Sequence, residues 1–193
     1  MTEPFIPYVE EDDYPEALMP VLGPYKERMG FVPNALKLYM HRPEICEPLW
    51  KLNSMVMRDP SSTLDQFLKR KLASVASHIN DSEYCVMHNT AMLKAAGGGA
   101  EGWDMDAGAV TALLDGAAEP ADEAEAACLA FVRAASENPS GVTAEILAEL
   151  KQHLTPPQIV ELACVVGFWK MYNCIHESLH VPIEEHFLKE DGE

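Results

Sequence analysis

Two helical patterns that meet near residue 80 constrain the fold more than any other feature of the chain. Apolar side chains recur at helical spacing from 64 to 78, at Leu64, Phe67, Leu68, Leu72, Val75 and Ala76. Asp81 or Ser82 can cap a second helix, which runs to the glycines at 97–99. No segment of useful length alternates between apolar and polar residues with period two. The sequence therefore predicts an all-α protein built around an antiparallel helical hairpin at 64–97.

The turn of this hairpin holds the residues whose side chains are chemically reactive. Cys85 falls in or just after the first turn of the second helix, where unpaired backbone N–H groups and the helix dipole favour a thiolate. His88 follows three residues later on the same face, so its imidazole can exchange a proton with the sulfur. Alternatively, Cys85 is a small buried apolar side chain and His88 is a hydrogen-bonded core histidine.

The segment around these residues, INDSEYCVMHN at 79–89, resembles the motif of the carboxymuconolactone decarboxylase superfamily, in its alkyl hydroperoxidase D-like, peroxidase-related branch. That branch usually reads Asn-x-Cys-x-Tyr-Cys-x-x-His-His after an apolar helix. Cys85 matches the second cysteine, which looks like the peroxide-attacking one, and His88 matches the first histidine of the pair. Weaker similarities at 30–43 and 154–182 extend the resemblance over most of the chain.

Three positions depart from the family pattern. Ser82 stands where the resolving cysteine would be, so no internal disulfide can return the site to its thiol form. Asn89 stands in place of the proton-relay histidine, and Arg70 in place of the relay glutamate. The resemblance therefore implies either a one-cysteine site that depends on an external thiol or a site that has lost its activity. Close to Cys85, Arg70 would stabilise a thiolate by a different route.

Thiol-dependent peroxide reduction is the activity that the resemblance implies, with no metal or other cofactor, in a homo-oligomer (dimer, trimer or hexamer). In this hypothesis Cys85 attacks a small-molecule peroxide and becomes a sulfenic acid, and His88 assists proton transfer. Ser82 and Asn89 supply hydrogen bonds, and an external thiol reductant restores the cysteine. Two alternatives remain open: a cofactor-free decarboxylase or lactone-converting enzyme, and a catalytically silent helical oligomer that binds a small molecule or a partner.

Length and composition predict one compact multi-helix bundle over residues 1–193, because a chain of 193 residues that is 48% hydrophobic can bury a core. Residues 1–24 contain several prolines and the acidic run at 10–13, which predicts an extended N-terminal arm with at most a short helix. Five cysteines without regular spacing favour reduced thiols and a cytoplasmic location. A net charge of -17 argues against nucleic-acid and anionic-membrane partners, and no apolar stretch is long enough to span a membrane.

A second motif competes with the thiol site. The segment HESLH at 176–180 fits His-Glu-x-x-His, and His186 falls where a third zinc ligand would stand in the longer metalloprotease pattern. However, Ile183 replaces the glycine at which the chain turns in that pattern. We therefore expect histidines at the end of a helix, interacting with its dipole, in preference to a zinc protease. A weaker structural metal site at His176, His180 and His186 is left open.

Overall fold

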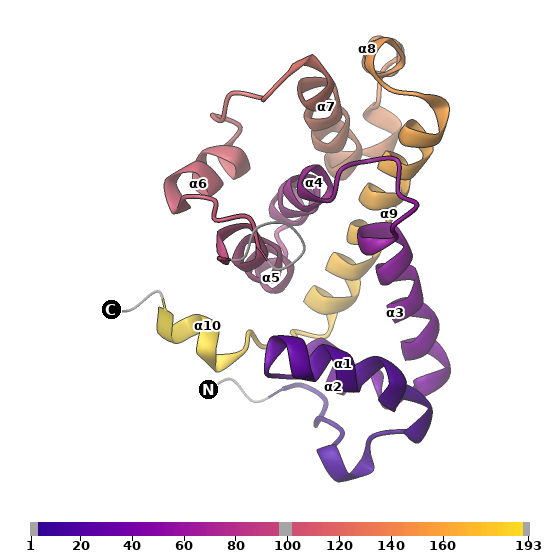
Figure 1. Ribbon diagram of the computed structural model, residues 1–193, viewed down its shortest axis with the longest axis vertical. Coiled ribbons are helices and arrows are strands. Elements are labelled where there is room, and N and C mark those ends of the chain that lie inside the picture. Colours follow the sequence, from indigo (N-terminus) through magenta and orange to yellow (C-terminus); the bar gives the residue numbers. More distant parts are fainter. Residues whose placement is uncertain (1–3, 97–101, 191–193) are drawn as a thin grey trace.

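The computed structural model describes residues 4–96 and 102–190 of the protein. Every regular element in these ranges is a helix, which confirms the predicted all-α fold (Figure 1). The α-helices are α1 (Met19–Met29), α2 (Asn34–Tyr39), α3 (Pro43–Arg58), α4 (Gln66–Ile79), α5 (Glu83–Lys94), α6 (Ala107–Asp115), α7 (Glu123–Glu137), α8 (Ala144–His153), α9 (Pro156–Ser178) and α10 (Glu185–Glu190). Short 3₁₀ turns lie at Glu11–Asp13, Glu16–Leu18 and Pro139–Gly141.

Helix α4 is the centre of the structure, with α5, α7 and α9 packed around it (Figure 1). Its apolar and small residues Leu72, Ala73, Val75 and Ala76 are completely buried. Asp65 begins the helix, because its side chain accepts a hydrogen bond from the backbone N–H of Leu68 at 2.9 Å. Small residues let neighbouring backbones come close, which explains how three helices can surround α4.

The α4–α5 pair forms the predicted hairpin. Asp81 adopts a left-handed backbone conformation with φ of 52° and turns the chain between the two helices. Ser82 occupies the N-cap position of α5, but its hydroxyl makes no capping hydrogen bond and is fully buried. The described part of α5 ends at Lys94, and the expected glycine stop at 97–99 lies outside the described residues.

The N-terminal segment differs from the extended arm expected over residues 1–24. Helix α1 begins at Met19, preceded by the two 3₁₀ turns. Pro20 sits in its first turn, where the missing N–H of proline leaves no hydrogen bond unmade. Leu18 and Leu22 are buried, and this burial offsets the cost of ordering the segment. The prediction of an extended conformation is therefore wrong from Met19 onward.

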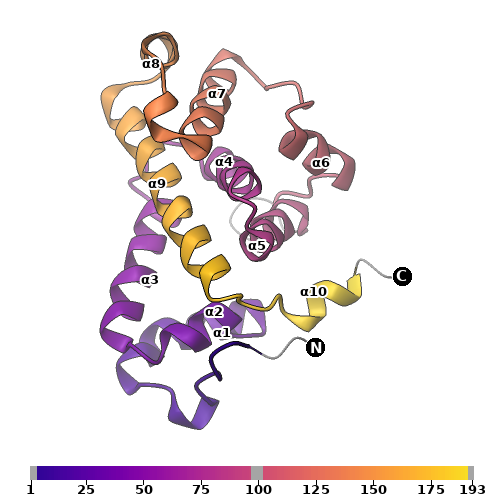
Figure 2. The ribbon, with the colours of Figure 1, turned by 180° about the vertical axis from the view of Figure 1, so that it is seen from behind.

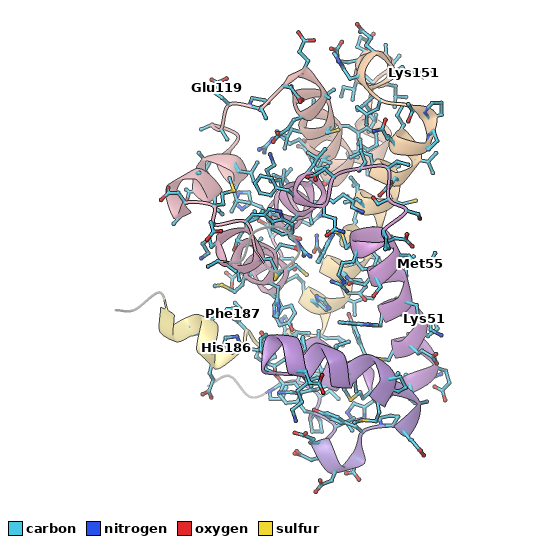
Figure 3. All side chains as sticks on the ribbon, in the orientation of Figure 1. Lys51, Met55, Glu119, Lys151, His186 and Phe187 are labelled. Carbon is cyan, nitrogen blue, oxygen red and sulfur yellow. The ribbon has the colours of Figure 1, made fainter. Side chains whose placement is uncertain are left out.

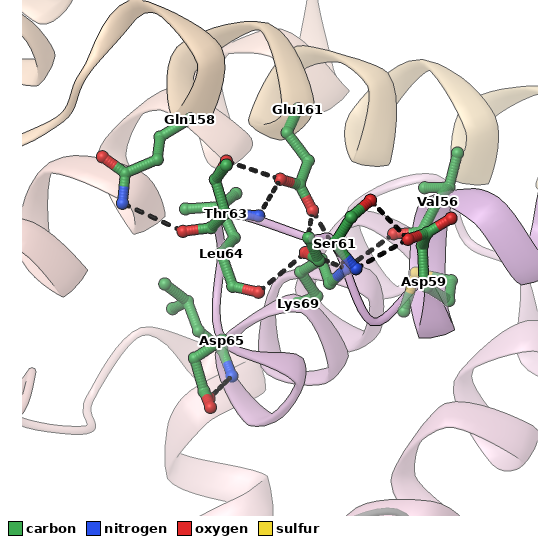
Figure 4. A network of polar contacts seen from close by, with 12 residues as sticks. Val56, Asp59, Ser61, Thr63, Leu64, Asp65, Lys69, Gln158 and Glu161 are labelled. Carbon is green, nitrogen blue, oxygen red and sulfur yellow. Dashed lines mark hydrogen bonds and ion pairs between the residues drawn. The ribbon is translucent and has the colours of Figure 1, made fainter.

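A polar network ties α4 and α9 to the loop between α3 and α4 (Figure 4). The side chain of Lys69 is completely buried, and its Nζ lies 3.0 Å from Oε1 of Glu161. The same ammonium donates to the carbonyl of Val56 at 2.9 Å and to Oγ of Ser62 at 2.7 Å. Glu161 also accepts hydrogen bonds from the backbone N–H and the hydroxyl of Thr63, at 2.8 and 2.7 Å. A buried charge is thereby paired and fully hydrogen-bonded.

After α9 the chain passes along the start of α2 before it forms α10 (Figure 2). His180 has a φ of 48°, a left-handed conformation that ends the preceding helical turn. Asn34 binds the following segment twice, through its side chain to the carbonyl of Pro182 at 3.0 Å and through its backbone N–H to Glu184 at 2.7 Å. These contacts fix the C-terminal segment beside the start of α2. None of the described helices combines the length and apolar character required to cross a lipid bilayer.

Candidate active site

A cavity of about 830 Å³ lies between α2, α3, α4, α5 and α9, with one residue of α10 in its wall. Aromatic side chains form much of the lining, namely Phe31, Tyr39, Trp50, Tyr84, Trp103, Trp169, Tyr172 and Phe187. Three basic side chains, Arg58, Arg70 and Lys94, also line it, and no acidic side chain does so among the described residues. This volume and this apolar lining suit an organic molecule with an aromatic or aliphatic body.

Cys85 lines this cavity and contacts an imidazole, but the imidazole is not that of His88. Its Sγ lies 3.0 Å from Nδ1 of His176, which α9 contributes from 91 residues along the chain. On the other side of the ring, Nε2 of His176 is 2.6 Å from the hydroxyl of Tyr39. A neutral imidazole that accepts the thiol proton at Nδ1 carries its own proton on Nε2, where it donates to Tyr39. The expectation that His88 reaches the sulfur is therefore corrected to His176.

Burial controls the protonation of this pair. Burial raises the pKa of the Cys85 thiol to about 12; the nearby Ser82 hydroxyl opposes this effect and the charge of Glu177 adds to it. Burial likewise lowers the pKa of His176 to about 3, with a smaller contribution from the charge of His88. The resting pair is therefore a neutral thiol and a neutral imidazole. This reverses the expectation that the start of a helix holds Cys85 as a thiolate.

His88 lines the same cavity and is bound to a carboxylate. Its Nε2 lies 2.7 Å from Oε2 of Glu184, whose side chain is only 7% exposed. Glu184 also accepts from the hydroxyl of Tyr84 at 2.9 Å and from the backbone N–H of Asn34 at 2.7 Å. Burial raises the pKa of Glu184, but hydrogen bonding and the charge of His88 together outweigh burial and lower it. Sequence reasoning missed Glu184 because a single glutamate after α9 carries no motif or periodic signal.

Asn89 and Arg70, the two altered relay positions, interact with each other. Nη1 of Arg70 donates to Oδ1 of Asn89 at 2.6 Å, and Nδ2 of Asn89 lies 3.4 Å from the hydroxyl of Ser77. Ser77 in turn donates to Asn173 at 3.1 Å, so a buried polar chain connects α4, α5 and α9. Asn89 thus supports the helices that carry the site, and the pKa of Cys85 responds to Ser82 and not to Asn89.

All five cysteines are free, consistent with the missing resolving cysteine. The histidines of the zinc-like motif have separate environments. His176 belongs to the thiol site, whereas the ring of His186 lies 4.4 Å from that of Phe31, centroid to centroid. No group of three or more histidine, cysteine, aspartate or glutamate side chains within the described ranges is arranged to hold a metal ion.

Comparison with known proteins places the fold. A scan against family models and a search of curated proteins found no match. Among solved structures, a peroxidase-related protein from Ralstonia eutropha JMP134, described as an alkylhydroperoxidase AhpD core, matches with a TM-score of 0.84 at 16% identity, over 97% of this chain and 95% of that chain. This is the AhpD-like fold. The predicted compact all-α bundle of the alkyl hydroperoxidase D-like type is thus confirmed as the fold of this chain.

Other proteins with the AhpD-like fold match over similar lengths. A peroxidase-related protein from Silicibacter sp. TM1040 has a TM-score of 0.82 at 21% identity, with 97% of each chain covered. The debrominase Bmp8, in a cysteine-to-alanine variant complexed with 2,3,4-tribromopyrrole, has a TM-score of 0.76 at 21% identity, with 95% of each chain covered. The AhpD-like fold therefore carries more than one described chemistry.

Proposed function

We propose that this protein is a one-cysteine, thiol-dependent reductase of organic hydroperoxides. The main support is the 3.0 Å contact between Sγ of Cys85 and Nδ1 of His176 in the wall of the large cavity. A nucleophile, a base and a third group that orients the base are the parts that such chemistry needs, and Tyr39 is the third group. The likeness to peroxidase-related proteins is further support.

The first half of the reaction oxidises the cysteine. His176 takes the thiol proton at Nδ1 as the sulfur attacks the distal oxygen of the hydroperoxide. The S–O bond forms and the O–O bond breaks, so Cys85 becomes a sulfenic acid and the remainder of the peroxide leaves as an alkoxide, which takes up a proton to become an alcohol. Because His176 is already neutral, it acts as a base without first losing a proton.

The second half needs an external thiol, because Ser82 replaces the resolving cysteine. One thiol condenses with the sulfenic acid to give a mixed disulfide and water. A second thiol attacks this disulfide, releases the external disulfide and restores the Cys85 thiol. The buried Ser82 hydroxyl has no hydrogen-bond partner among the described residues, so it is available to donate to the sulfur as negative charge develops there. We assign Asn89 an indirect role through its contact with Arg70.

Trapping of the sulfenic acid tests this proposal. Wild-type protein treated with cumene hydroperoxide and dimedone should carry the adduct at Cys85, and turnover with dithiothreitol should be lost in Cys85→Ser and fall about 10²-fold or more in His176→Gln. Cys128→Ser is the matched control, because Cys128 is equally buried but lies outside the cavity lining. Equal turnover in wild type and Cys85→Ser would contradict the proposal and favour the decarboxylase or lactone-converting alternative.

Reductive dehalogenation is a second candidate, favoured by the likeness to a debrominase and by the aromatic lining of the cavity. In the balanced reaction, one aryl bromide and two thiols give the ring with hydrogen in place of that bromine, together with bromide, a proton and a disulfide. Bromide release from 2,3,4-tribromopyrrole with excess thiol, dependent on Cys85, would support it. Absence of turnover with both substrate classes would favour the catalytically silent oligomer.

A further inference from the structure

We propose that His88, held by Glu184, is the general acid that protonates the departing alkoxide. This inference rests on the proposed hydroperoxide reduction and deepens it. His176 and His88 then divide the proton transfers: His176 takes the proton of the attacking thiol, and His88 gives a proton to the leaving oxygen. His88 regains its proton from solvent, and His176 releases one when Cys85 has returned to the thiol form.

The anchoring of Glu184 is the first observation. The carboxylate accepts three hydrogen bonds from groups at fixed positions: the His88 ring, the Tyr84 hydroxyl and the backbone N–H of Asn34. A carboxylate held by three donors cannot turn away, so it fixes the imidazole that donates to it. The Nε2–H of His88 is engaged with Glu184 at 2.7 Å, and the imidazolium form keeps a second, transferable proton on Nδ1.

The position of His88 in the cavity is the second observation. The ring of Tyr84 has its centroid 4.5 Å from that of His88 and 5.0 Å from that of His176, so both imidazoles contact one aromatic side chain. Both histidines line the cavity that holds Cys85. A hydroperoxide in this cavity would therefore meet both imidazoles, each of which contacts the Tyr84 ring.

Aromatic side chains complete the surroundings of His88. Phe187 of α10 packs against it with a centroid distance of 5.1 Å, and Phe31 lies 6.3 Å away. Figure 3 labels Phe187 and its neighbour His186 on α10. These rings cover most of the imidazole on the cavity side, and the 18% of the His88 side chain that is exposed lets it regain a proton from solvent.

Electrostatic coupling between the two histidines supports the same assignment. The charge of His88 lowers the pKa of His176, so the two rings are close enough for their charges to repel. The two imidazoles that take part in the proton transfers therefore interact electrostatically across the cavity.

The basicity of the leaving group offers a test that distinguishes general-acid catalysis by His88 from a purely structural role of this residue. Cumene hydroperoxide releases a strongly basic alkoxide, which needs an acid, whereas perbenzoic acid releases a weakly basic carboxylate, which does not. In His88→Gln, the rate of Cys85 sulfenic acid formation should fall about 10²-fold or more with cumene hydroperoxide and remain within about threefold with perbenzoic acid. Glu184→Gln should show the same selectivity with a smaller loss.

His186→Gln is the matched control, because His186 lies beside the same Phe31 but is exposed and outside the cavity lining. It should react like the wild type with both oxidants. An equal loss with both oxidants in His88→Gln, or no loss with either, would overturn the assignment while leaving Cys85 chemistry intact. No reaction of wild-type Cys85 with either oxidant would instead overturn the proposed function, and this inference with it. Thermal unfolding of each variant verifies that the compared proteins are folded.

Discussion

At the scale of single residues, the environment of Cys85 is decided by burial. The end of a helix stabilises a charge by about 0.3–1 kcal/mol. Burial raises the pKa of Cys85 to about 12, which corresponds to about 4 kcal/mol against the thiolate. Burial has the larger effect on the pKa, so the thiol is protonated at rest. It depends on His176 to take its proton as it reacts.

The pH dependence of alkylation follows from this balance. Iodoacetamide reacts with the thiolate, and its iodide leaves without a proton. Because the pKa of Cys85 is raised, the thiolate fraction grows about tenfold for each pH unit until the pH approaches 12. We therefore expect alkylation of Cys85, followed by mass spectrometry of its peptide, to be slow at pH 7 and to rise steadily up to pH 11. A rate that is already constant above pH 8 would contradict this prediction.

Ser82→Cys should change the reductant requirement. Ser82 and Cys85 are three residues apart at the start of α5, a spacing that suits a disulfide, and Ser82 is close enough to lower the pKa of the thiol. One equivalent of cumene hydroperoxide should then remove two titratable thiols from the Ser82→Cys protein, against one from the wild type. Ser82→Ala is the control, and loss of one thiol only in Ser82→Cys would show that the two sulfurs cannot meet.

At the scale of elements, the Lys69–Glu161 pair holds α4 and α9 in the register that brings Cys85 to His176. Burial raises the pKa of Glu161, but hydrogen bonds from Ser62, Thr63 and Lys69 outweigh this and lower it to about 2. The folded protein therefore prefers the ionised carboxylate. This stabilisation is present above the ordinary glutamate pKa and is lost as the pH falls toward 2.

Glu161→Gln should lower the free energy of unfolding by about 2–3 kcal/mol at pH 7, because it leaves the buried ammonium of Lys69 without its counter-charge. Urea unfolding at pH 7 and pH 3 measures the effect. The difference from wild type should shrink at pH 3, where the wild type is losing the same stabilisation. Glu137→Gln, at an exposed position at the end of α7, should have little effect. A constant difference at both pH values would contradict the assigned role.

At the scale of the whole molecule, an apolar surface runs along α3 and α9. Met55 and Val160 are each 63% exposed, and Figure 3 shows Met55 on the outer side of α3. Cys164 and Cys174 are also exposed on α9, and open space surrounds Gly167. We propose that a second copy of the chain covers this surface, as the expected homo-oligomer requires.

Val160→Lys should therefore shift the protein toward a smaller species in analytical ultracentrifugation, because a charge would be buried between copies. Leu188→Lys on α10 is the control, since Leu188 is an exposed apolar residue and α10 lies on the side of the molecule opposite α3 (Figure 1). Iodoacetamide labelling of Cys164 should increase in parallel with dissociation. A wild-type protein that sediments as a monomer at every concentration would contradict the prediction.

The sequence alone determined the helical hairpin, because capping residues and apolar spacing act within neighbouring turns of one helix. It also placed Cys85 at the start of α5 and Ser82 in the position of the missing cysteine, since both follow from a local motif. In the sequence, His176 was identified only as part of the zinc-like His-Glu-x-x-His pattern at 176–180.

The tertiary structure decided which groups meet the sulfur and how strongly each holds its proton. His176 reaches Cys85 across 91 residues and Glu184 reaches His88 across 96 residues, so both contacts depend on how α9 and the segment after it pack against α5. The pKa of Cys85 likewise depends on burial, a property of the assembled core that no local spacing encodes.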